Sequence, residues 1–98
     1  MTINKIQNGP ALTVAVEGRL DTTTAPALEA ELKAAYPELT DLTLDFAGLE
    51  YISSAGLRVL LSAQKTMSKQ GAMKIVNVCP DIMEVFDITG FSDILTIG

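Results

Sequence analysis

Histidine is absent from the 98 residues of this chain. It is the side chain that enzymes use most often as a general base, the commonest ligand of transition metals, and a member of the Ser-His-Asp triad. Its absence argues against the commonest hydrolytic and metal-dependent sites. We therefore expect a protein that is not an enzyme, with no catalytic residue, no cofactor and no metal.

Cysteine and long apolar runs are equally scarce. Cys79 is the only cysteine, so no internal disulfide can form, and a reducing compartment is the natural setting. The start of the chain lacks the apolar run of a signal peptide, and no stretch approaches the roughly 20 apolar residues that cross a bilayer. The expected location is the cytoplasm.

Positive charge is also in short supply, with seven basic against 12 acidic residues and a net charge of −5. Nucleic acids and anionic membranes favour basic surfaces, so neither is expected as the main partner. Hydrophobic residues make up 48% of the chain, which is enough to form a core. Residues 1–98 are expected to form one domain.

Hydrophobic spacing predicts an alternation of strands and helices. Strands are expected at Ile3–Gln7 (an edge), Ala11–Glu17, Leu42–Phe46, Met73–Val78 and a short Leu95–Ile97. Helices are expected from a Thr24 cap to a stop at Pro37, from Ser54 to Lys69 with Gly71 ending the helix, and from Pro80 to Gly90. The run Met73–Val78 is apolar enough to be covered on both faces. The predicted class is α/β, with helices packed against the sheet.

Two polar loops are expected to meet at one end of this sheet. Asp21 follows one strand and the Ser53-Ser54 pair follows another, and parallel strands bring their carboxyl ends to the same edge. Asp21 is either a turn residue or a carboxylate placed beside the serines. Asp45 is a second candidate for this region. Two carboxylates there could bind a cation or orient a hydroxyl, but their spacing alone does not require either.

The serine pair stands where the longest predicted helix begins. One of the two serines is expected to be the N-cap, accepting hydrogen bonds from free backbone amides. A phosphate at this position would meet unpaired N–H groups and the positive end of the helix dipole. It would also add about −1.5 to −2 charges, enough to reject an acidic or close-packed partner. Capping and phosphorylation can coexist at this pair.

Several segments together resemble the STAS family, the bacterial anti-sigma factor antagonists. They are Val16–Asp21, Thr24-Ala25, Leu44–Phe46, Tyr51–Leu60 and Glu84–Phe91. The segment Tyr51–Leu60 is the most specific. The resemblance implies a single STAS-like α/β domain with a mixed sheet of four to five strands.

The resemblance also implies a function. Such a protein, when dephosphorylated, captures an anti-sigma factor that is also a serine kinase and so frees the sigma factor. Phosphorylation of a serine at the helix start releases the partner, and a PP2C-type phosphatase restores binding. The implied partner-binding residues are Asp21, Thr22, Thr23, Ser53, Ser54, Gly56, Leu57 and Arg58.

Alignment on Gly56 selects the acceptor serine. In family members that read Asp-Ser-Ala-Gly the serine after the aspartate is phosphorylated, which corresponds to Ser54. Ser53, the reserve candidate, takes the aspartate position. In Asp-Ser-Ser-Gly members the acceptor is the second serine, where this chain has Ala55. A STAS scaffold subunit of a signalling or lipid-transport complex, with no phosphorylation cycle, is the alternative, and a small hydrolase using Ser54 lacks an evident base.

Overall fold

The computed structural model describes all residues from 1 to 98 and contains five strands and three α-helices. The strands are β1 (Thr2–Asn8), β2 (Ala11–Leu20), β3 (Asp41–Asp45), β4 (Leu49–Ile52) and β5 (Ala72–Val76). The helices are α1 (Ala25–Ala35), α2 (Ser54–Gln70) and α3 (Pro80–Thr89), with short 3₁₀ turns at Tyr36–Glu38 and Phe91–Asp93.

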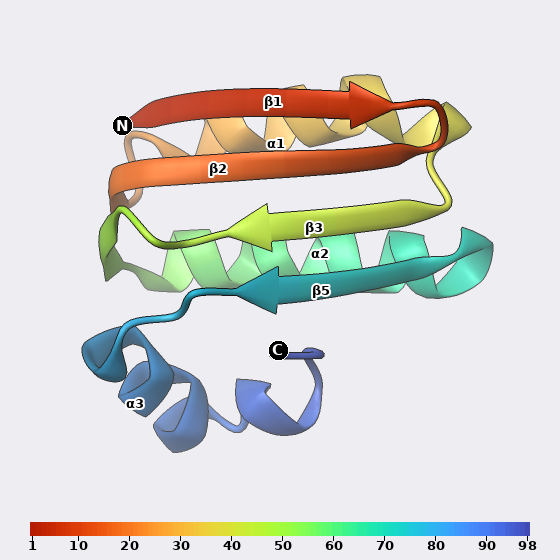
Figure 1. The fold of residues 1–98 in the computed structure, drawn as a ribbon. Coiled ribbons are helices and arrows are strands. Elements are labelled where there is room, and N and C mark those ends of the chain that lie inside the picture. The colour runs from red at the N-terminus through yellow and green to blue at the C-terminus, as the bar shows by residue number, and fades with distance from the viewer.

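The strands form one mixed sheet in the order β1-β2-β3-β5, and β4 pairs with the end of β2. β1 is antiparallel to β2 and forms an edge, whereas β2, β3, β4 and β5 pair in parallel. This arrangement confirms the predicted α/β class, the edge strand and the mixed sheet. It also brings the carboxyl ends of the parallel strands to one side of the molecule (Figure 1).

Helices α1 and α2 lie on the same face of this sheet (Figure 1). The chain moves in one direction across the sheet from β2 to β3 to β5, and right-handed crossovers then place both helices on one side. The expectation that Met73–Val78 is covered on both faces was therefore wrong. Met73 and Ile75 are buried, but Lys74 between them is exposed.

The core between the sheet and the helices is entirely apolar. It contains 23 buried hydrophobic residues, and no polar or charged residue is buried. Phe46 and Phe86 are its largest fully buried side chains, and Leu28, Leu32 and Leu60 contribute from the helices. Polar side chains therefore lie at or near the surface, and Gln64 Oε1 is the one side-chain oxygen that is buried without a hydrogen-bond partner. No helix has the combination of length and apolar character that crossing a bilayer requires.

Strand β4 and the end of β2 differ from the prediction. β2 continues beyond Glu17 to Leu20. It pairs with β3 from Ala11 to Ala15 and with β4 from Gly18 to Leu20, and the register of the pairing with β4 shifts between Gly18 and Arg19. β4 was missed because only Leu49 and Ile52 of its four residues are buried. Such spacing lacks the alternation that marks a strand. The predicted strand Leu95–Ile97 is reduced to a single bridge between Ile75 and Ile97.

Helix ends follow the prediction at two places and depart from it at two others. α1 ends before Pro37, and Gly90 ends α3 with a φ of 80°. Thr24 precedes α1, but its side chain makes no capping hydrogen bond. Gly71 ends α2 in an extended conformation, with a φ of 172°, and not in the left-handed one typical of helix ends.

Candidate functional site

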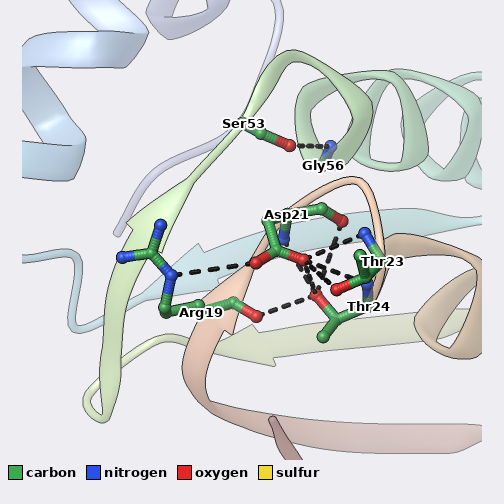
Figure 2. Close-up of polar contacts among 6 residues, drawn as sticks. All are labelled: Arg19, Asp21, Thr23, Thr24, Ser53 and Gly56. Atoms are coloured by element: carbon green, nitrogen blue, oxygen red, sulfur yellow. Dashed lines mark hydrogen bonds and ion pairs between the residues drawn. The ribbon is translucent and has the colours of Figure 1, made fainter.

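The loop after β2 and the start of α2 lie side by side at the carboxyl end of the sheet. The backbone N–H of Ser53 donates to the carbonyl oxygen of Leu20 at 2.9 Å. This bond extends the parallel pairing of β2 and β4, and it joins the two loops that the sequence places at one edge. Figure 2 shows Ser53 next to the turn at Asp21.

The turn at Asp21 is held by its own side chains (Figure 2). Asp21 Oδ1 accepts from the Thr23 hydroxyl at 2.7 Å, from the Thr23 backbone N–H at 3.0 Å and from the Thr24 N–H at 3.1 Å. Thr24 Oγ1 donates to the Arg19 carbonyl and accepts from the Asp21 N–H, both at 2.8 Å. Thr24 therefore fixes the turn and does not cap α1. Thr22 and Thr23 remain exposed at the tip.

The carboxyl group of Asp21 titrates below its ordinary range. The hydrogen bond from the Thr23 hydroxyl is the largest cause, and backbone amides add to it, so the pKa lies below 3.8. A lowered folded-state pKa means that ionised Asp21 stabilises the fold above about pH 4, and that this contribution is lost as the pH falls through the folded pKa.

Replacing Thr23 with valine is expected to raise the pKa of Asp21 toward 3.8, because it removes the hydroxyl donor and keeps a similar shape. A carboxyl ¹³C NMR titration of both proteins measures the change. Asp45 provides the internal control, since Asn77 Nδ2 and the Ala47 N–H lower its pKa without any contact to Thr23. An unchanged Asp21 titration would contradict the assigned cause.

Arg19 and Tyr51 add a cationic and aromatic surface beside this turn, and the sequence did not reveal it. The two residues are register partners across β2 and β4. The Arg19 guanidinium carbon lies 4.0 Å from the centre of the Tyr51 ring, a cation–π geometry. Arg19 Nε also lies 3.7 Å from Asp21 Oδ2. The pair was missed because it depends on β4, although an exposed aromatic next to the serine motif was a usable signal.

The two serines have different roles at the start of α2. Ser53 is the N-cap, and its hydroxyl oxygen accepts from the Gly56 N–H at 3.4 Å (Figure 2). Ser54 is the first residue of the helix and is exposed. Its hydroxyl makes no hydrogen bond within the chain, whereas that of Ser53 is half-buried and engaged. Ser54 thus offers the more accessible oxygen.

Gly56 and Leu57, both expected at the partner surface, are buried. A Cβ on Gly56 would lie 2.8 Å from Leu20 Cγ and 2.9 Å from Ile52 Cγ1, so glycine allows the helix start to pack on the sheet. Leu57 is 7% exposed and belongs to the core. Their side of α2 faces the sheet, and they position the site from beneath.

Two exposed residues of the predicted set, Thr22 and Arg58, line an open groove between α1 and α2. Arg58 is exposed on α2, and Thr22 is exposed at the turn. The groove residues are Thr22, Ala25, Pro26, Glu29, Ala55, Arg58 and Val59. The structure thus joins the Asp21 turn and the start of α2 into one surface.

The two candidate carboxylates each have their own donors. Asp45 Oδ1 accepts from the Ala47 N–H and from Asn77 Nδ2, both at 3.0 Å, while Asp21 is bonded within its turn. No group of three or more histidine, cysteine, aspartate or glutamate side chains is arranged to hold a metal ion. The arrangement presents an exposed serine near an open groove.

Known proteins are similar to this chain in both sequence and fold. Residues 2–98 match the family model of the STAS domain. The chain belongs to the STAS domain family. BtrV from Bordetella bronchiseptica, provisionally named an anti-sigma factor antagonist, is 36% identical over all of this chain and 84% of its own length. The anti-sigma-B factor antagonist of Bacillus subtilis is 33% identical over 94% of this chain and 85% of its own.

The fold of this STAS domain agrees with a solved structure. The crystal structure of an anti-sigma factor antagonist from Mycobacterium paratuberculosis superimposes with a TM-score of 0.88. The match covers 98% of this chain and 83% of the Mycobacterium paratuberculosis chain, at 25% sequence identity. The predicted STAS fold is therefore confirmed across nearly the whole chain.

Proposed function

We propose that this STAS domain is an anti-sigma factor antagonist, a cytoplasmic binding protein and not an enzyme. In its dephosphorylated form it binds an anti-sigma factor that is also a serine kinase, and this capture frees the sigma factor. The observation that carries the proposal is the exposed hydroxyl of Ser54 at the first residue of α2, beside the Asp21 turn. The names of its relatives support the partner class.

Phosphorylation of Ser54 is proposed as the switch that ends binding. A phosphate at this position lies near unpaired backbone N–H groups and the positive end of the helix dipole, so the fold can accept it. It also places about −1.5 to −2 charges at the centre of the contact surface. Release then follows from local charge and bulk, without a change of fold. A PP2C-type phosphatase restores the binding form.

The proposed contact surface is formed by the exposed turn and the start of α2. Asp21, Thr22 and Thr23 contribute from the turn, and Ser53, Ser54 and Arg58 contribute from the helix. Gly56 and Leu57 support this surface from below. Neither nucleic acid nor membrane is a proposed partner, in keeping with the net charge of −5.

Intact mass spectrometry tests the switch directly. The chain is incubated with ATP and the anti-sigma factor kinase of the same bacterium, after the kinase has been shown to bind ATP. We expect one phosphate on the wild type and on Ser53→Ala, and none on Ser54→Ala. A phosphate that persists on Ser54→Ala but is lost from Ser53→Ala assigns the switch to Ser53. An unmodified wild type, bound by the kinase, supports the scaffold alternative.

A further inference from the structure

The outward side of α2 carries positive charge only. The helix contains Arg58, Lys65 and Lys69 and has no aspartate or glutamate. All 12 acidic residues, together with the other four basic residues, lie outside it. A helix of this kind is a local reversal of charge in a chain whose net charge is −5.

These three side chains form one line along the helix, here called the cationic stripe. At 100° per residue, Arg58, Lys65 and Lys69 lie within about 40° of one another and span about 16 Å along the axis. All three are exposed. The ion pairs of the chain are formed elsewhere, by Lys5–Glu31, Arg19–Asp21 and Lys33–Glu29. The stripe is therefore free to pair with charges on another molecule.

An apolar groove runs beside the two lysines of the cationic stripe, Lys65 and Lys69. It lies between α2 and the C-terminal segment, and Ile94 on its far side is 48% exposed. Leu61 supplies a half-buried apolar surface from α2. The groove residues are Leu61, Gln64, Lys65, Ser68, Lys69 and Ile94. Apolar residues flanked by two lysines match a segment that carries apolar side chains on one side and carboxylates on the other.

We propose that the cationic stripe and this groove bind an acidic, amphipathic segment of the anti-sigma factor. The inference rests on the proposed function and extends its contact surface from the start of α2 along the whole helix. Ser54 lies about 40° from Arg58 around the helix, so a partner seated at Ser54 meets the stripe next. The apolar groove and the net charge of −5 favour a protein over a nucleic acid.

The two parts of this surface are expected to act on different rate constants. The lysines lie at the rim, where charge speeds association and makes it sensitive to salt. The exposed Ile94 side chain, which is covered on binding, instead slows dissociation. Charge reversal and apolar truncation therefore have separable signatures.

Binding kinetics with the anti-sigma factor of the same bacterium test the proposal. We expect the double variant Lys65→Glu/Lys69→Glu to bind roughly ten- to a hundredfold more weakly, mainly through slower association, with a smaller dependence on salt. Lys5→Glu/Lys74→Glu is the matched control, because it makes the same charge change at exposed residues that line neither groove beside α2. Its affinity is expected to stay within about threefold of the wild type. Ile94→Ser is expected to dissociate faster at an unchanged association rate.

The outcomes separate this inference from the function on which it rests. If the wild type binds and Lys65→Glu/Lys69→Glu binds equally well, the stripe is not part of the interface and the proposed function stands. If the wild type fails to bind the anti-sigma factor, the proposed function and this inference both fall. Sedimentation equilibrium tests whether a second copy of the chain binds the stripe instead. A wild-type dimer that the double variant dissociates assigns the stripe to a second copy of the chain and overturns the proposal.

Discussion

Replacing Ser54 with aspartate is expected to weaken binding of the anti-sigma factor at least about a hundredfold, roughly 3 kcal/mol. The new carboxylate places a permanent negative charge at the exposed first residue of α2, in the middle of the proposed contact surface. A buried interfacial charge without a partner costs several kcal/mol. Isothermal titration calorimetry with the cognate anti-sigma factor measures the loss.

Two further variants are controls. One places a negative charge elsewhere on the chain, and the other removes the Ser54 hydroxyl without adding a charge. Gln7→Glu adds a negative charge near the end of β1. Gln7 pairs with Leu12 near the start of β2, at the opposite end of the strands from Ser54. We expect it to bind as the wild type does. Ser54→Ala, which removes only the hydroxyl, should also keep its affinity. Equal binding by Ser54→Asp and the wild type, with both proteins folded by circular dichroism, would show that Ser54 lies outside the interface.

Most of the fold could be predicted because its elements have clear hydrophobic periods. β2, with Leu12, Val14 and Val16 buried at every second position, is one example. β4 has no such period, since two exposed residues separate Leu49 from Ile52. Its pairing with β2 depends on a register shift at Gly18, which the local sequence pattern does not show. The missing strand also concealed the Arg19–Tyr51 contact.

The proximity of the two candidate loops could be predicted from the sequence, but the detail of their contacts could not. Parallel strands guarantee that the Asp21 turn and the serine pair share one end of the sheet, and this follows from topology alone. Which serine caps α2 depends on the backbone conformation of one residue, as the extended Ser53 shows with a ψ of 175°. The burial of Leu57 was visible in the helical period of α2. The family resemblance implies Leu57 as a contact residue from its place in the motif, and it takes no account of which face of the helix the side chain lies on.

Gly71 ends α2, but the usual reason for a glycine at the end of a helix does not apply to it. Its φ of 172° is open to any residue, so the left-handed conformation does not explain the glycine. Space does. A Cβ at this position would lie 1.9 Å from the carbonyl oxygen of Thr40, 2.6 Å from its carbonyl carbon and 2.8 Å from its Cα. These are backbone atoms of the residue just before β3, and they cannot move aside as a side chain could.

Gly71→Ala is therefore expected to lower the free energy of unfolding by roughly 3 kcal/mol or more. The same Thr40 carbonyl accepts the Ala72 N–H at 2.9 Å, and Asp41 is the register partner of Ala72, so relief of the overlap must separate β5 from β3. For a domain of this size the loss corresponds to a fall of about 12 °C or more in Tm. Urea denaturation followed by far-ultraviolet circular dichroism measures it, since the chain has no tryptophan.

Gly90→Ala is the matched control for this change. Gly90 also ends a helix, but its φ is 80° and nothing lies within 4 Å of an added Cβ. Its substitution costs only the strain of a left-handed alanine, about 1 to 2 kcal/mol. The larger loss is expected at Gly71, although its backbone angle is the ordinary one. If the two variants lose equal stability, the strands yield to the methyl group and the contact with Thr40 does not set the requirement for glycine.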